Sequence, residues 1–328
     1  MIKEEEIRPE VIFDEYLRLT SEDVITYFSN VKSEQIKCPS CGSKGEFWVV
    51  KQNFTYEKCD DCQTIFVNPR PLKEAFDAYY TDSPSTKYWA TTFYKVTESA
   101  RREKLWKPKA QLVKSIIEEF QGKDKVQYIV DIGGGYGVFD EEIKKIMDIE
   151  VLIIEPSVHL AMICRDKGFE VSEKFLEDII DSDLPSSKKC FVSFELFEHL
   201  HDPFKFLQSL EKVMLKGDMF IFTTLSGMGV DIQVLKENSK SVSPPHHLNF
   251  FNPKSVSKLI NDVGLEVLKA ETPGKLDIDI MKNNIDKTGD YFWNSFLNYA
   301  SEDEMQSMQD YLAGNGLSSH MMITCIKK

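Results

Sequence analysis

Glycine alternates with other residues in a short stretch near the middle of the chain, directly after an apolar run. The run ends at Val130, and a helical pattern opens at Val138. The stretch between them reads Asp131-Ile132-Gly133-Gly134-Gly135-Tyr136-Gly137. Without a Cβ, glycine lets the backbone turn tightly and lie directly against a ligand. Strand, glycine turn and helix, in this order, are typical of a loop that binds a nucleotide-like cofactor.

An acidic residue also ends the next apolar run. The run is 151–154, and Glu155 follows it. An acid at the tip of a second strand can accept hydrogen bonds from both hydroxyls of a ribose. The alternative is a solvated loop residue, but the complete glycine pattern upstream favours the ribose function.

The spacing of the glycines distinguishes two cofactor classes. A dinucleotide fold requires Gly-x-Gly-x-x-Gly, and its third glycine would fall at position 138, which is valine. The pattern present, Asp-x-Gly-x-Gly-x-Gly, resembles the first motif of the class I S-adenosylmethionine (SAM)-dependent methyltransferases. The resemblance implies that SAM is bound by Asp131, Gly133, Gly135, Tyr136, Gly137, Glu155 and Pro156.

A fourth strand, predicted over 190–195, ends at Phe194 and Glu195. It resembles the family segment that lines the methionine end of SAM, which adds both residues to the predicted cofactor site. Its start, Lys189–Phe191, departs from the acid-rich start that is common in the family. Glu198 follows as a candidate catalytic group, although it could instead anchor the loop through hydrogen bonds.

Two adjacent histidines follow two prolines in the segment 243–251. A neutral imidazole can take a proton from an acceptor hydroxyl near neutral pH, although a structural histidine is the alternative. The segment resembles the histidine loop of sugar and small-molecule methyltransferases, in which the second position bears the base. His247 is therefore preferred to His246 as the base. A metal site formed by the two histidines lacks a carboxylate at ligand spacing.

Four of the seven cysteines lie in two C-x-x-C pairs about 17 residues apart, a spacing typical of a zinc ribbon. The expected ligands are Cys38, Cys41, Cys59 and Cys62. Four thiolates leave no open coordination position, so the predicted zinc is structural. Two redox-active pairs are the alternative, but the thioredoxin-like context that they need is absent.

The remaining pattern predicts an α/β fold: a Rossmann-like, doubly wound methyltransferase sheet that is mostly parallel, with an antiparallel last strand and a small N-terminal zinc-ribbon lobe. The expected organisation is a helical arm (1–35), the ribbon (36–72), a helical lid or linker (73–109) and the SAM-binding domain (110–328). Within the last domain we expect a loop of about 28 residues after strand 218–224, and a long helical stretch over about 288–312.

Net charge and composition limit the classes of partner and the location that we expect for this chain. The net charge of −13 argues against a nucleic-acid surface, and no run approaches the roughly 18 apolar residues of a membrane span. The acidic N-terminus is unlike a signal peptide, so a cytoplasmic location is expected. The combination of lobe and domain resembles methyltransferases of bacterial sugar and surface-glycan pathways, including sugar C-methyltransferases. This implies methyl transfer to a hydroxyl or an activated carbon of a nucleotide sugar or glycan. The alternatives are an RNA methyltransferase and a non-catalytic SAM-binding scaffold.

Overall fold

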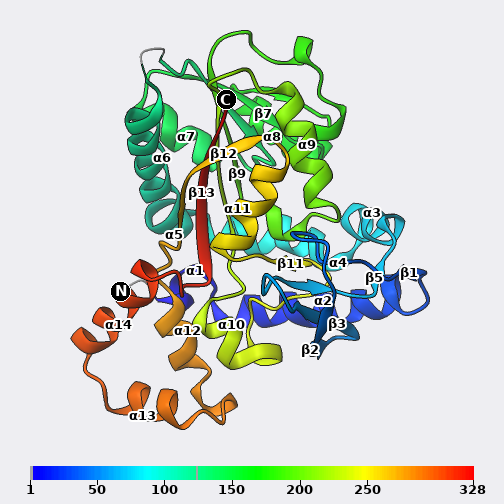
Figure 1. Cartoon of the computed structure of the whole chain (residues 1–328), viewed down its shortest axis with the longest axis vertical. Coiled ribbons are helices and arrows are strands. Elements are labelled where there is room, and N and C mark those ends of the chain that lie inside the picture. Colours follow the sequence, from blue (N-terminus) through cyan, green and yellow to red (C-terminus); the bar gives the residue numbers. More distant parts are fainter. Residues whose placement is uncertain (1–2, 123–124) are drawn as a thin grey trace. The chain divides into compact units, whose positions relative to one another are not determined.

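The computed structural model describes residues 3–122 and 125–328, which form two compact units (Figure 1). The first, here called the ribbon unit, comprises the described part of Met1–Arg101 with Leu225–Ser255 and Thr272–His320. The second, the sheet unit, comprises the described part of Arg102–Thr224 with Val256–Glu271 and Met321–Lys328. The stretch 110–328 is thus interrupted twice by segments of the ribbon unit, a division that differs from the expected single SAM-binding domain.

A seven-stranded sheet forms the centre of the sheet unit, in the order β12-β13-β10-β9-β6-β7-β8. Its strands are β6 (Tyr128–Ile132), β7 (Glu150–Ile154), β8 (Glu170–Ser172), β9 (Lys189–Phe194), β10 (Met219–Leu225), β12 (Leu265–Glu271) and β13 (His320–Lys327). The pairs β10–β9, β9–β6, β6–β7 and β7–β8 are parallel, and β13 is antiparallel to β12. The predicted mostly parallel α/β sheet with an antiparallel last strand is confirmed.

The helices of the sheet unit alternate with these strands. They are α6 (Lys107–Phe120), α7 (Val138–Ile146), α8 (Val158–Asp166), α9 (Pro203–Val213) and α11 (Pro253–Asp262), with short turns η2 (Arg102–Trp106), η3 (Leu176–Asp178), η4 (Asp181–Asp183) and η5 (Phe197–His199). The central strands β6, β7, β9 and β10 are mainly buried apolar runs, as parallel strands covered on both faces require.

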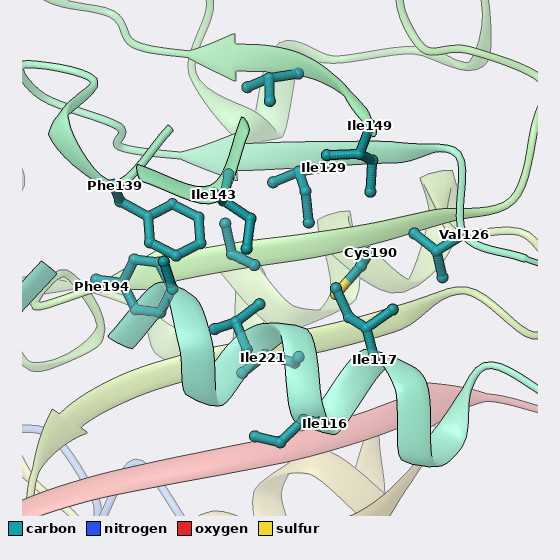
Figure 2. Close-up of a cluster of buried hydrophobic side chains, with 14 of the residues drawn as sticks. Ile116, Ile117, Val126, Ile129, Phe139, Ile143, Ile149, Cys190, Phe194 and Ile221 are labelled. Carbon is teal, nitrogen blue, oxygen red and sulfur yellow. The ribbon is translucent and has the colours of Figure 1, made fainter. Parts of the chain in front are cut away.

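One apolar cluster joins α6, α7 and α8 to one face of the sheet. Figure 2 shows Ile116 and Ile117 of α6 and Phe139 of α7 among side chains of the strands. The ring of Phe139 packs on that of Phe194 at the end of β9, with centroids 4.6 Å apart. This contact anchors the start of α7 beside the carboxyl end of β9, where the glycine loop lies.

Alternate residues of β10 point to the opposite face, as strand geometry requires. The rings of Phe220 and Phe222 stack with centroids 4.7 Å apart. Phe206 of α9 contacts Phe220, and Phe197 contacts Phe222. Helix α9 therefore covers the second face of the sheet.

A four-stranded sheet, in the order β11-β4-β3-β2, forms the centre of the ribbon unit. Its strands are β2 (Gly45–Lys51), β3 (Phe54–Cys59), β4 (Ile65–Val67) and β11 (Asn249–Phe250), and a separate pair comprises β1 (Ser33–Glu34) and β5 (Arg70–Pro71). Strand β11 comes from the segment that carries the paired histidines and is antiparallel to β4. The sheet of the ribbon unit thus includes a strand that lies almost two hundred residues after β4 in the sequence.

The remaining elements of the ribbon unit are helical. They are α1 (Glu4–Ile7), α2 (Glu10–Phe28), α3 (Lys73–Asp82), α4 (Pro84–Tyr88), η1 (Trp89–Phe93), α5 (Tyr94–Arg101), α10 (Val230–Leu235), η6 (Lys236–Asn238), α12 (Asp277–Asn283), η7 (Ile285–Lys287), α13 (Tyr291–Tyr299) and α14 (Glu302–Gly314). The helical character expected for 1–35 and 73–109 is present, whereas the function of 73–109 as a lid stays a prediction. No helix in the described parts of the chain is both long and apolar enough to cross a membrane.

The structure refines two expectations about the C-terminal third. The helical stretch predicted over about 288–312 consists of two helices, because Ser301 accepts a hydrogen bond from the N–H of Glu304 and begins α14 anew. The loop expected after β10 contains the helix α10, whose Val230 and Leu235 pack in an apolar cluster with α12, α13 and α14. Both differences arise from local signals, a capping box and a short apolar face.

Candidate active site

The glycine loop joins β6 to α7 and has the backbone conformation that its glycines allow. Gly133, Gly135 and Gly137 have φ angles of 75°, 57° and 65°, in the left-handed region that residues with a Cβ rarely adopt. The N–H of Gly133 donates to the carbonyl of Ile154 at 2.8 Å, and that of Gly137 donates to the carbonyl of Gly134 at 2.9 Å. These bonds fasten the loop to the neighbouring strand and close its turn.

The space around the loop differs from one glycine to the next. A Cβ on Gly134 would lie 2.7 Å from Cγ2 of Ile153, so this residue is small because the strand beneath it is close. A Cβ on Gly135 would meet no described atom within 4 Å. The backbone at Gly135 therefore borders open space.

Glu155, at the end of β7, binds the loop through its carboxylate. Oε2 accepts from the N–H of Gly135 at 3.0 Å, and Oε1 accepts from the N–H of Ser157 at 2.9 Å. Burial raises the pKa of Glu155, while the two N–H bonds act in the opposite direction. Asp131, the glycines and Glu155 lie together, as the motif predicted. Two further residues were predicted to contact the cofactor. The backbone carbonyl of Tyr136 accepts a hydrogen bond from Lys167, and Pro156 is half-buried beside Glu155.

Two buried carboxyl groups lie beneath the glycine loop. Asp131 is the next-to-last residue of β6, and Asp140 lies in the first turn of α7; both are buried. Among the described residues, no donor bonds Oδ1 of Asp131 or either oxygen of Asp140. A buried acceptor without a donor is costly, so a cationic group of a cofactor would be stabilised at this point. The motif identified Asp131, but no sequence signal identified Asp140.

Lys109 of α6 approaches the end of β9. Its Nζ lies 3.2 Å from Oε1 of Glu195 and 4.7 and 4.8 Å from the ring centroids of Phe194 and Trp106. Thr223 also donates to Oε1 of Glu195, at 2.8 Å. Glu195 itself has a φ of 55°, which is uncommon for a residue with a side chain. The predicted cofactor residues Phe194 and Glu195 are thus held by a lysine that sequence reasoning missed, because its partners lie far away along the chain.

Glu198 follows in the turn η5 and is buried. The hydroxyl of Thr224 donates to its Oε2 at 3.0 Å. Burial, reinforced by the charge of Glu195, raises the pKa of Glu198 to about 8. The raised pKa favours the protonated form near neutral pH, which suits an acid better than a base.

His246 and His247, both in the ribbon unit, have different surroundings. His246 is buried, and its Nε2 lies 2.7 Å from the hydroxyl of Tyr79. Its ring also contacts those of Tyr16 and Tyr80. Burial lowers the pKa of His246 to about 3, with a further contribution from His247. Its chemistry is that of a neutral structural ring rather than of a proton acceptor in turnover.

His247 is only half-buried. Its Nδ1 lies 2.6 Å from the carbonyl oxygen of Ser241. Because a carbonyl oxygen only accepts, Nδ1 carries the proton, and the neutral ring then has its lone pair on Nε2. The hydroxyl of Tyr56 donates to the carbonyl of His247 at 2.8 Å. This tautomer and this anchored main chain are suited to a general base.

The strand that follows His247 is bound to the ribbon. Asn249 and Phe250 pair with Phe66 and Ile65 of β4. The fully buried Arg70 bonds the side-chain oxygen of Asn249 at 2.7 Å. Sequence reasoning missed both connections, because a two-residue strand carries no periodicity.

The four predicted cysteines converge. Each Sγ atom lies within 4.8 Å of the other three. The Sγ atoms of Cys38 and Cys62 are 3.5 Å apart, and those of Cys41 and Cys59 are 3.4 Å apart. A tetrahedral zinc with Zn–S bonds of about 2.3 Å needs sulfurs about 3.8 Å apart, so this donor set fits the ion. Nearby, Asn252 donates to the carbonyl of Cys62 at 2.7 Å, and Ser40 donates to that of Ser255 at 2.8 Å.

The sheet unit has a doubly wound α/β fold, with the glycine loop at the carboxyl end of β6. Residues 101–270, just over half of the chain, match the family described as "Methyltransferase domain". The chain belongs to this family and is a SAM-dependent methyltransferase. Among curated proteins, none matches the chain significantly.

Solved structures similar to this chain include two methyltransferases. The plantazolicin methyltransferase BpumL in complex with S-adenosylhomocysteine (SAH) is 13% identical, with 78% of this chain and 95% of that one covered and a TM-score of 0.49. A SAM-dependent methyltransferase from Archaeoglobus fulgidus is 17% identical, with 71% of this chain and 100% of that one covered and a TM-score of 0.47.

Proposed function

We propose that SAM binds at the glycine loop of the sheet unit and that a small, hydroxyl-bearing acceptor, a nucleotide sugar or a glycan precursor, receives its methyl group. The proposal that SAM binds here rests on two observations: the open space at Gly135 and the carboxylate of Glu155 beside it. The backbone of the loop would lie against the nucleoside, and Glu155 would exchange its backbone donors for ribose hydroxyls. Phe194 and Glu195, with Asp131, would border the methionine end.

His247 is the proposed base. Bound SAM supplies a methyl group already activated on a sulfonium sulfur, so the protein has only to align the acceptor and take its proton. Oxygen–carbon bond formation accompanies carbon–sulfur bond cleavage, SAH leaves, and Nε2 of His247 accepts the proton from the acceptor hydroxyl. The tautomer set by the carbonyl of Ser241 supports this role. His246 would instead hold the loop through Tyr79.

The four cysteines are proposed to bind a structural zinc ion. A closed set of four sulfurs leaves no position for substrate. The ion would hold the small β2–β3–β4 sheet, and that sheet carries β11 and the main chain of His247. In this proposal the metal acts on catalysis only through the position of the base.

An acidic surface supports a small-molecule acceptor rather than a nucleic acid. The net charge is −13, and a phosphate-tracking surface is normally basic. This leaves the nucleotide sugar as the acceptor class to test first.

The test incubates the zinc-loaded enzyme with methyl-labelled SAM and a panel of nucleotide sugars, and measures label in the sugar. His247→Ala should retain SAH binding by calorimetry and lose at least a hundredfold in turnover, a typical loss for a removed base. His159→Ala, which removes an exposed histidine of α8, is the matched control and should behave as wild type. Unchanged turnover in His247→Ala would remove this histidine from the mechanism. SAH binding without methylation of any sugar nucleotide would refute the acceptor class and favour the non-catalytic scaffold.

A further inference from the structure

One backbone carbonyl keeps the proton of the His247 ring in place. The carbonyl oxygen of Ser241 lies 2.6 Å from Nδ1 of His247. A carbonyl beside one nitrogen of a neutral imidazole keeps the proton on that nitrogen and leaves the lone pair on the other. The base proposed above therefore depends on the orientation of this carbonyl, and the other contacts of Ser241 determine that orientation.

The side chain of Ser241 is bound by a buried acid, Asp231. The hydroxyl of Ser241 donates to Oδ2 of Asp231 at 3.2 Å, and the hydroxyl of Ser239 donates to the same oxygen at 3.3 Å. The N–H of Ser241 in turn donates to Oγ of Ser239 at 3.1 Å. One carboxylate oxygen thus closes the turn over 239–241. Because the hydroxyl and the carbonyl belong to the same residue, the bond to Asp231 also limits how far the carbonyl of Ser241 can rotate.

Helix α10 fixes Asp231 from two sides. Val230 packs in an apolar cluster with residues of α12, α13 and α14. Ile232 belongs to a second apolar cluster, which also contains Val242 and Leu248 from before and after the two histidines. The carboxylate and the loop that it binds are therefore attached to the same closely packed core, which resists a shift of either.

A carboxyl group is unfavourable at this position unless it has a function. Asp231 is fully buried, and within the parts of the chain that the structure describes no donor bonds its Oδ1. Burying a carboxylate with one oxygen unbonded costs free energy, so packing alone does not account for an acid here. Burial raises the pKa of Asp231 to about 6. At pH 8 the ionised form, which can accept from both serines, is therefore favoured.

We propose that Asp231 is a positioning residue for His247: by holding the hydroxyl of Ser241, it orients the carbonyl that keeps the ring proton on Nδ1. The inference rests on the proposed function of His247 as the base. No proton passes through Asp231, because the serine bonds the acid with its hydroxyl and the ring with its carbonyl. Asp231 acts only through the orientation of Ser241.

Ser241→Ala separates this function from folding. It removes the hydroxyl that bonds Asp231 and keeps the carbonyl that bonds Nδ1, while Nζ of Lys51 still donates to the carbonyl of Ser239 at 2.7 Å. Ser241→Thr keeps a hydroxyl and should restore the wild-type behaviour. Asp231→Asn weakens the same bond, because an amide oxygen is a poorer acceptor than a carboxylate, and should add little when combined with Ser241→Ala. Ser307→Ala, which removes an exposed hydroxyl from α14, is the control.

The experiment is ¹⁵N NMR of the histidine rings in the zinc-loaded full-length protein at pH 8, where an ordinary imidazole is neutral. The signals of His247 are those lost in His247→Gln. In wild type the two ring nitrogens should differ widely in chemical shift, with the proton on Nδ1. In Ser241→Ala and Asp231→Asn the two shifts should move toward each other as both tautomers become populated, whereas Ser241→Thr and Ser307→Ala should match wild type. This measurement needs neither cofactor nor acceptor, so it tests the positioning independently of the proposed function.

Turnover with labelled SAM gives the second readout. In Ser241→Ala kcat should fall roughly tenfold, with KM and SAH affinity unchanged, because only the alignment of the base is lost. Unchanged ring shifts in Ser241→Ala and Asp231→Asn overturn the proposal and leave His247 as the candidate base. Altered shifts with unchanged turnover also overturn it, and His247→Ala then shows whether the base itself was wrongly assigned. If Asp231→Asn does not fold, Ser241→Ala and its rescue by Ser241→Thr decide the proposal.

Discussion

The hydroxyl of Tyr56 donates a 2.8 Å hydrogen bond to the backbone carbonyl of His247. Tyr56 lies in β3 and is fully buried, so the bond fastens the main chain of the candidate base to the sheet that adjoins the four cysteines. Strand β11 adds a second attachment two residues further on, through its pairing with β4. The cysteine-rich segment thus contributes to the candidate chemistry by holding a loop.

Tyr56→Phe should lower turnover without lowering affinity for the cofactor. The ring stays in the core and only the hydroxyl is lost, which removes a hydrogen bond worth about 1 kcal/mol. Misplacing a base by a fraction of an ångström lowers the rate, so a several-fold loss of turnover is expected. Steady-state kinetics and SAH calorimetry give the two readouts. Tyr128→Phe, on β6 of the sheet unit, is the control. Equal turnover in both variants would show that this bond does not position His247.

Removal of zinc should loosen the ribbon and the histidine loop together. The cysteine end of the ribbon is held only by a small apolar cluster that includes the four cysteines, so a bound metal would supply much of its stability. Hydrogen exchange after chelation should rise in β2–β4 and in residues 246–252, and stay unchanged in β6, β7 and β9. Adding zinc back should restore protection in both segments. Increased exchange in the ribbon with a protected histidine loop would show that the two are not coupled.

The parts of the fold that the sequence predicted well are those with local signals. Apolar runs identified β6, β7, β9 and β10 to within two residues. The glycine pattern, together with the acid at 155, located the loop and its carboxylate, and paired cysteines located the quartet of sulfurs. In each case neighbours in sequence are also neighbours in space.

The parts that could not be predicted depend on contacts between distant segments. Nothing at Asn249 indicates that it pairs with Phe66 of the ribbon. Nothing in the sequence at Lys109 indicates that its ammonium group contacts Glu195 and two aromatic rings. Asp140 occupies an otherwise ordinary helical pattern, and only its burial shows that it needs a partner. Burial of His246 likewise separates two histidines that the sequence presents as a pair.

Gly135→Ala should weaken SAM binding at little cost to folding. Gly135 has a φ of 57°, so alanine costs about 1 kcal/mol of backbone strain, but its Cβ meets no described atom within 4 Å. The methyl group would project into the proposed cofactor space, and at least a tenfold loss of SAH affinity is expected. Gly168→Ala is the matched control, because Gly168 has a φ of 86° and open surroundings at the end of α8.

Gly134→Ala, in contrast, should mainly lower the stability of the fold. Its Cβ would lie 2.7 Å from Ile153, so the melting temperature should fall as strand β7 is displaced. Thermal melts and SAH calorimetry on the three variants separate strain, clash and cofactor contact. Equal loss of affinity in Gly135→Ala and Gly168→Ala would indicate that the loop does not touch the ligand.

The free energy of unfolding should fall as the pH rises from 6.5 to 8.0, and the ionisation of Glu198 should account for part of this fall. The pKa of Glu198 is about 8 in the folded protein, against about 4.3 for an unperturbed glutamate. Between these two pKa values the folded state binds a proton that the unfolded state has lost. Each rise of one pH unit therefore lowers the free energy of unfolding by up to about 1.4 kcal/mol. Asp140, with a pKa of about 7, acts in the same direction over the lower part of the range. His246 acts in the opposite direction but only below about pH 6.5, where the unfolded ring gains a proton that the buried ring does not.

The measurement is the change in melting temperature between pH 6.5 and 8.0. It should be smaller in Glu198→Gln than in wild type, because glutamine keeps the shape of the neutral acid and cannot ionise. Comparing the two changes cancels the contribution of every other titrating group, including the metal-site thiols. Glu119→Gln removes an exposed carboxyl group and should reproduce the wild-type change. An identical change in Glu198→Gln and wild type would mean that Glu198 is already ionised at pH 6.5, and it would restore this residue as a candidate base.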